Sequence, residues 1–226
     1  MIATIVNTAA VVAGGLIGLL AKKGLPERIS KGIMAAIGLM LICSGVKGYF
    51  DGQSSIIAVL SLALGTGLGE LLRLEERLNH LGERIGARVS RSGGSRIGEG
   101  LVTATLLFCV GAMAVLGSLQ SGLAGDHTTL YTKSLMDFIS AILLASTYGI
   151  GVVLSAIGVL LYQGAITLLA GLLAPVMTEA AIAELSAVGS IVLVGLGLNL
   201  TGVAKLRVMN MVPSIFIAIL LAQIMH

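Results

Sequence analysis

One acidic residue lies inside a long apolar stretch and is the position in this sequence that most directly suggests chemistry. Across residues 134–177, Asp137 is the only acid and no base is present. An isolated buried charge is costly, so a carboxylate in such a segment faces a cavity, a cation or a partner side chain. We expect Asp137 to bind a cation or to carry a proton. The alternative is an ion pair with Lys133, which lies four residues earlier on the same helical face.

Polar and small residues extend this position into a stripe at helical spacing. The stripe continues from Asp137 through Ser140, Leu144, Thr147, Gly151, Ser155 and Gly158. Two clusters rich in Gly, Ser and Thr add further pathway candidates, which are Ser146, Thr147, Gly149 and Gly151 in one and Cys109, Gly111 and Gln120 in the other. Such clusters mark either broken helices whose backbone lines a cavity or helix faces that pack closely. Together with Asp137 they predict the lining of a pathway for a small solute or ion.

Three amide side chains complete the candidate pathway. Asn7, Gln163 and Asn199 lie in apolar runs, where amides can coordinate cations or hydrogen-bond a zwitterion without burying a charge. The alternative for each is an interhelical hydrogen bond. That alternative applies equally to other polar residues in apolar runs, which are Gln120, Tyr162, Glu184 and Asn210.

The residue pattern gives no support to enzyme chemistry. The histidines, which are His80, His127 and His226, lie in expected loops or at the end of the sequence, so they cannot form a metal site within the apolar segments. HExxH, GxSxG and Walker A motifs are absent, and Cys43 and Cys109 lack metal-ligand spacing. The sequence therefore predicts neither an enzyme nor a metal or cofactor, and any transport would be passive or ion-coupled.

The elements that position these residues must be membrane-spanning helices. Of the 226 residues, 56% are hydrophobic and 11% charged, whereas a soluble domain carries about 25% charged residues. Apolar windows predict an all-α integral membrane protein with eight spans, at residues 2–20, 31–48, 55–71, 101–123, 134–148, 150–173, 182–203 and 211–225. The fifth and eighth windows are short for a full crossing of about 20 residues, so tilted, half-length or re-entrant segments are the alternatives there.

Lys and Arg give the predicted orientation. Twelve of the 14 basic residues fall on one side of an eight-span arrangement, and the positive-inside rule makes that side cytoplasmic. Both termini are then outside. A seven-span arrangement would put Lys205 and Arg207 outside, so we prefer eight spans. The basic residues lie between apolar runs rather than in one patch, so the pI near 9.0 does not indicate nucleic-acid binding.

The spans are expected to form one transmembrane domain over residues 1–226, with an internal repeat. Residues 73–100 are predicted to be a cytoplasmic amphipathic connector, because apolar residues recur there at helical spacing between charges. Spans one to three resemble spans six to eight weakly, since Val12, Ile17, Gly18 and Leu20 match Val152, Ile157, Gly158 and Leu160. Span one enters the membrane from outside and span six from the cytoplasm, so the repeat is inverted, with spans four and five between its halves. Inverted repeats are a recurrent construction in secondary transporters.

Several short motifs also match a known family. They are Phe108-Cys109-Val110-Gly111, Gly117-Ser118, Gly125-Asp126, Lys133-Ser134-Leu135-Met136-Asp137 and Tyr162-Gln163-Gly164, with Asn7-Thr8 and residues 65–69. Over essentially the whole chain this pattern resembles the YdfK/YqgA-like family of bacterial membrane proteins, which has proline where this chain has Ala112. The resemblance implies a multi-spanning protein of the bacterial inner membrane. It supplies no substrate, because the family is of unknown function.

Two functional hypotheses follow from the sequence. The first is a transporter or channel for a small solute or ion, with a hydrated cavity that converges on Asp137 and residues 146–151. The second is a non-transporting structural, sensory or regulatory partner protein, in which this region is dry and its polar groups satisfy each other. The expected partners are the lipid bilayer and a small solute or cation. Gly-rich helix faces would also suit a homo-oligomer, and Gly14/Gly18 and Gly65/Gly69 are expected to be close-packing helix interfaces.

Overall fold

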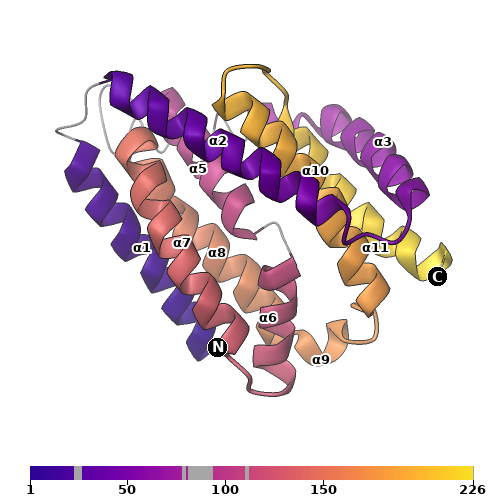
Figure 1. The fold of residues 1–226 in the computed structure, drawn as a ribbon. Coiled ribbons are helices and arrows are strands. Elements are labelled where there is room, and N and C mark those ends of the chain that lie inside the picture. The colour runs from indigo at the N-terminus through magenta and orange to yellow at the C-terminus, as the bar shows by residue number, and fades with distance from the viewer. Residues whose placement is uncertain (23–26, 78–79, 81–93, 110–111, 226) are drawn as a thin grey trace. The chain divides into compact units, whose positions relative to one another are not determined.

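The computed structural model describes the chain except for residues 23–26, 78–79, 81–93, 110–111 and 226, and every regular element in the described part is a helix (Figure 1). The elements are α1 (Ile2–Lys22), α2 (Glu27–Tyr49), α3 (Ser55–Leu72), α5 (Gly94–Cys109), α6 (Ala112–Leu123), α7 (Thr128–Tyr148), α8 (Ile150–Leu168), α9 (Ala170–Leu173), α10 (Glu179–Leu200), the 3-10 helix η1 (Val208–Met211) and α11 (Pro213–Met225). The prediction of an all-helical protein is confirmed. Most of the expected amphipathic connector, residues 73–100, lies outside the described residues.

The described helices are long and apolar enough for a multi-span membrane protein. Six of them meet the length and hydropathy of a membrane span, and the α5–α6 pair makes a seventh if it counts as one bent span. The two helices of that pair lie at 58° to each other. Helix α7 has 21 residues, about 31 Å, which is enough to cross. It is nevertheless not among these six spans, because its buried Lys133 and Asp137 lower its hydropathy.

The chain divides into two compact units. Unit 1 contains Met1–Met34, Glu76–Cys109 and Met113–Gly171, and unit 2 contains Ala35–Glu75, Val110–Ala112 and Leu172–His226. Many large apolar side chains are exposed, including Leu71 and Ile224 at 80% and 79%. Apolar surface of this extent is typical of helices that contact lipid, because the bilayer core is as apolar as the side chains that it covers.

Glycines let α1 pack closely in unit 1. Helix α1 lies along α7 and also contacts α8, while α5 packs against α8 (Figure 1). A Cβ on Gly14 would collide with the carbonyl oxygen of Phe138, and a Cβ on Gly18 with that of Ile142. Only glycine permits such an approach of two helix backbones. Because later residues of α1 meet later residues of α7, the two helices run parallel.

Unit 2 is packed in the same way. A Cβ on Gly65 would collide with the backbone of Ser214, and a Cβ on Gly69 with the carbonyl of Asn210, which brings α3 onto α11 and η1. Gly38 of α2 likewise lies against Gly197 of α10. The close packing expected at Gly14/Gly18 and Gly65/Gly69 is therefore present within one copy of the chain.

Candidate functional site

Four polar side chains meet inside unit 1, and we call them the polar cluster: Asn7 of α1, Lys133 and Asp137 of α7, and Gln163 of α8. Asn7 Nδ2 donates to Asp137 Oδ2 at 3.0 Å and to Gln163 Oε1 at 3.1 Å. Lys133 Nζ donates to both carboxylate oxygens of Asp137, at 2.8 and 2.6 Å. All four residues are at most 7% exposed. Three helices thus converge on one charged, hydrogen-bonded group in the apolar interior.

Neighbouring residues extend the polar cluster along the seam between α1 and α8. Thr4, one turn before Asn7, shares a hydrogen bond of 3.3 Å with Thr167, one turn after Gln163. The close approach of α1 to α7 at Gly14 and Gly18 brings Asn7 within reach of Asp137.

The polar cluster leaves two buried amide atoms without a hydrogen-bond partner, Asn7 Oδ1 and Gln163 Nε2. The orientation of the Asn7 amide is fixed by its two acceptors, since a flipped amide would set its oxygen against the Asp137 carboxylate. A buried polar atom without a partner costs about 1 to 3 kcal/mol. One acceptor atom and one donor group of the cluster are therefore unpaired among the described residues.

Three members of this cluster were separate candidates in the sequence analysis: Asn7, Asp137 and Gln163. The structure brings them together. Lys133 was predicted only as the alternative partner of Asp137, and the ion pair is present at 2.6 Å. Sequence alone contained the signal for this pair in the spacing of four residues. The contact of Asp137 with α1 and α8 required the tertiary structure.

The remaining candidates make contacts outside the polar cluster. Ser146 donates to the carbonyl of Leu143, Gln120 accepts from Thr129, and Asn199, in unit 2, bonds both backbone groups of Leu206. Gly149 joins α7 to α8 at a φ of 80°, which glycine adopts without strain, and Gly151 packs against the Ile97 carbonyl of α5. The other predicted positions are Ser140 and Thr147, which are half-buried, Cys109, which is buried, and Gly111, which lies outside the described residues.

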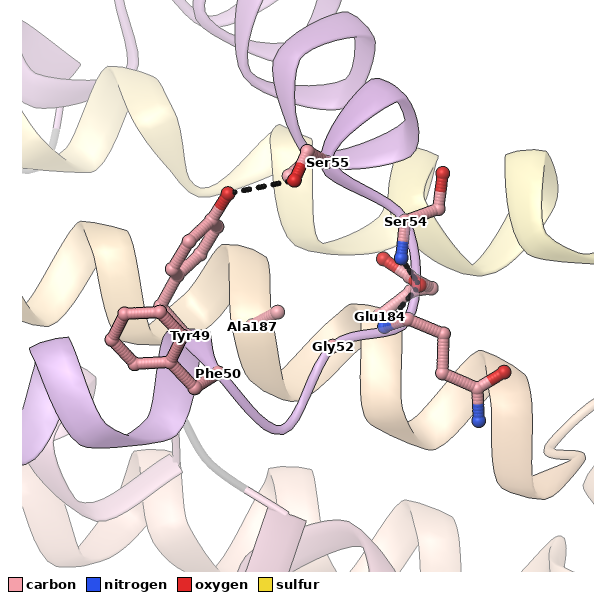
Figure 2. Close-up of a pocket in the computed structure, with 9 residues that line it drawn as sticks. Tyr49, Phe50, Gly52, Ser54, Ser55, Glu184 and Ala187 are labelled. Carbon is pink, nitrogen blue, oxygen red and sulfur yellow. Dashed lines mark hydrogen bonds between the residues drawn. The ribbon is translucent and has the colours of Figure 1, made fainter.

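A second buried carboxylate, Glu184, lies at the start of α10 in unit 2 (Figure 2). Its Oε1 accepts from the backbone N–H groups of Gln53 and Ser54 at 2.8 and 2.7 Å. Ser54 is the N-cap of α3, so the carboxylate also lies where the helix dipole is positive. A cavity of about 150 Å³ adjoins it, lined by residues that include Tyr49, Phe50 and Ala187. The alternative role expected for Glu184 was an interhelical hydrogen bond. The bonds from Gln53 and Ser54 agree with it, because they join α10 to the start of α3.

Removing the Glu184 carboxylate should destabilise the protein more than neutralising it. Glu184→Ala loses two charge-assisted hydrogen bonds and is expected to cost about 3 to 5 kcal/mol. Glu184→Gln keeps an acceptor oxygen and should cost about 1 to 2 kcal/mol. Thermal unfolding of the purified variants measures the difference. Equal losses in both variants would contradict a capping role and would mean that the charge itself is required.

Polar contacts at the other end of unit 2 join α3 to the α10–α11 connection. Arg207 pairs with Glu70 at 3.0 Å, and Asn210 Oδ1 accepts from the backbone N–H of Glu75 at 2.9 Å. The Glu75 carboxylate accepts from Met209 N at 3.2 Å, and partial burial raises the pKa of Glu75 above its ordinary value. The end of α3 and the α10–α11 connection therefore lie at the same end of the unit.

Comparisons with known proteins agree with the resemblance seen in the sequence. The family described as "Protein of unknown function (DUF554)" matches residues 2–223. The chain is 34% identical over 230 residues to the "Uncharacterized membrane protein YdfK" of Bacillus subtilis (strain 168), covering all of this chain and 97% of that protein. It is 30% identical over 222 residues to the "Uncharacterized protein YqgA" of Escherichia coli (strain K12), covering 96% and 94%. No solved structure matches the chain. The chain is thus a multi-pass membrane protein that belongs to the DUF554 family.

Proposed function

We propose that the protein is a transporter or channel for a small solute or ion and not an enzyme. The observation that carries this proposal is the polar cluster, in which α1, α7 and α8 bury four polar side chains in an apolar unit. Ionisable residues in membrane helices are costly and usually belong to a substrate or ion pathway. Two buried amide atoms of the cluster have no hydrogen-bond partner among the described residues, and a bound solute would supply one.

The directions of the helices favour eight crossings. Helix α1 runs parallel to α7 and antiparallel to α8, since Thr4 bonds Thr167 while Gly15 lies against Val153. Crossings must alternate along the chain. Helices α1 and α8 can cross in opposite directions only if an even number of crossings lies between them. If α2 and α3 both cross, the α5–α6 pair and α7 must therefore either both cross or both fail to cross. Helix α7 follows α1 over several turns, which favours a full crossing.

The ion pair between Arg207 and Glu70 opposes the seven-span alternative. Glu70 ends the third span, beside the Arg-rich residues 73–100, and Arg207 lies between the last two spans. A seven-span arrangement would put these two side chains on opposite sides of the bilayer, where they could not pair at 3.0 Å. The pair supports a common cytoplasmic side, and hence both termini outside.

Helix pairing also supports an inverted repeat. Under the predicted correspondence, α1, α2 and α3 match α8, α10 and α11, and each helix contacts its counterpart in antiparallel orientation. In α2 and α10, Gly38 meets Gly197 and Gly45 meets Ser190. The parallel pair α1–α7 has its own counterpart in α8–α5, where Gly151 meets Ile97 and Gly158 meets Thr105. A two-fold axis in the membrane plane would produce this set of contacts, which is the construction of many secondary transporters.

A growth and uptake screen tests the proposed function. A strain without the gene is compared with the same strain carrying the wild-type gene, across ions, amino acids and polyamines. At least one solute should show uptake that depends on the gene. If no solute does, the non-transporting alternative, a structural, sensory or regulatory membrane protein, is favoured instead.

Cysteine labelling tests the proposed orientation. In a chain with Cys43→Ser and Cys109→Ala, Thr128→Cys should react with a membrane-impermeant thiol reagent on intact cells, because it lies on the predicted outer side. Val203→Cys, whose native side chain is 76% exposed, should react only after the membrane is permeabilised, because it lies between the last two spans. Labelling of Val203→Cys but not Thr128→Cys on intact cells would invert the orientation.

A further inference from the structure

The net charge of the polar cluster restricts what it can bind. Lys133 and Asp137 form a bidentate pair at 2.8 and 2.6 Å, so the cluster as a whole is neutral. A simple cation that entered would compete with the ammonium group already seated on the carboxylate. A simple anion would meet that carboxylate. In an apolar interior, a net charge added to a balanced pair has no compensation.

The hydrogen-bonding groups left over are of both kinds. Gln163 Nε2 has hydrogens to donate, and Asn7 Oδ1 can accept. Both side chains are fully buried, and they touch each other through the 3.1 Å bond between Asn7 Nδ2 and Gln163 Oε1. A ligand that satisfies both atoms must therefore carry an acceptor and a donor only a few ångströms apart.

We propose that the polar cluster binds a small zwitterion with an ammonium and a carboxylate group on the same carbon, the chemistry of an α-amino acid. In this complex the ligand carboxylate would accept from Gln163 Nε2 and Lys133, and its ammonium would donate to Asn7 Oδ1 and Asp137. Such a ligand adds no net charge and pairs with every group of the cluster. This inference rests on the proposed transport function and names its substrate class, in place of the cation or proton expected from the sequence.

Thermal unfolding of the purified full-length protein tests the substrate class without a transport assay. With Cys43→Ser, which removes the exposed thiol, a fluorogenic thiol dye reports unfolding through the buried Cys109. The probes are glycine, L-alanine, L-serine and L-threonine, each at about 10 mM, against methylamine, acetate and trimethylglycine. At least one amino acid should raise Tm by about 3 °C or more, because a ligand that binds only the folded state stabilises it. Trimethylglycine has no N–H to donate and should have no effect.

Substitutions in the polar cluster test whether the rise in Tm comes from binding there. Gln163→Leu and Asn7→Leu should each abolish the rise in Tm, whereas Glu184→Gln, which changes a carboxylate in unit 2, should preserve it. If the two Leu variants cannot be purified, the comparison of probes on the wild-type cluster decides. A response to methylamine or acetate alone, or to none of the amino acids, would overturn the zwitterion proposal. Transport itself would still stand if the uptake screen had found a gene-dependent solute.

Discussion

Asp137→Asn should lower uptake of a gene-dependent solute at least about tenfold, a loss of about 1.4 kcal/mol. Asparagine keeps the shape of the side chain and one acceptor oxygen, so the hydrogen bond from Asn7 at 3.0 Å can persist. The substitution removes the negative charge that pairs with Lys133. In the zwitterion proposal the same charge also binds the ligand ammonium group. Initial uptake rates, normalised to the amount of protein in the membrane, measure the effect.

The same substitution should also destabilise the fold, by about 3 to 5 kcal/mol, because it leaves the Lys133 ammonium buried beside a neutral amide. The sequence offered an ion pair with Lys133 as the alternative role of Asp137, and the structure contains that pair. Lys133→Gln, the matched single variant, should be destabilised to a similar extent. The double variant Lys133→Gln/Asp137→Asn should recover most of the stability, since replacing both charges together is often close to neutral.

The double variant separates structure from function. If it restores Tm but not uptake, the charges serve transport. If it restores both, the ion pair is structural and Asp137 does not bind the solute. Normal uptake by the single variant Asp137→Asn would likewise show that the Asp137 carboxylate does not bind the solute. Asn199, the other candidate amide, is an unpromising substitute because both of its polar atoms bond the backbone of Leu206.

Much of the helical framework could be predicted because the length of an apolar run is a local property. The predicted span at residues 2–20 corresponds to Ile2–Lys22, and that at 55–71 to Ser55–Leu72. The helices depart from the predicted spans at two places where the hydropathy of the sequence does not change. The fourth window, 101–123, is divided between α5 and α6, and the sixth, 150–173, ends at Leu168 before the short α9. Hydropathy marks neither division, although a broken helix was one alternative for the cluster that contains Cys109 and Gly111 in the fourth window.

The candidate site was predictable only in parts, for a related reason. Asp137, Asn7 and Gln163 are visible as polar residues in apolar runs, but their contacts span 130 and 156 residues of chain. These contacts depend on glycine-mediated packing between helices, for which one sequence gives little guidance. The structure also shows that several Ser and Thr residues bond the carbonyl of the preceding turn, as Ser146 does with Leu143. A hydroxyl in an apolar run is therefore a weak indicator of a pathway.

Two glycines of α3 should respond in opposite directions to the same substitution. A Cβ on Gly69 would collide with the carbonyl carbon and oxygen of Asn210, whereas a Cβ on Gly67 meets nothing within 4 Å. The Asn210 backbone cannot move easily, because its N–H bonds the Arg207 carbonyl at 3.0 Å and its side chain bonds Glu75 at 2.9 Å. Gly69→Ala therefore requires α3 to separate from η1.

We expect Gly69→Ala to cost about 3 kcal/mol, at the upper end of the usual range for overpacking, because the obstacle is backbone rather than a flexible side chain. Gly67→Ala should instead stabilise the protein by about 0.5 to 1 kcal/mol, since alanine has the higher helix propensity and no clash opposes it. Thermal unfolding followed through Cys109 measures both variants. Similar effects from the two would show that α3 does not approach Asn210 this closely. In that case Gly65 and Gly69 would not form the seam on which α3 meets η1 and α11.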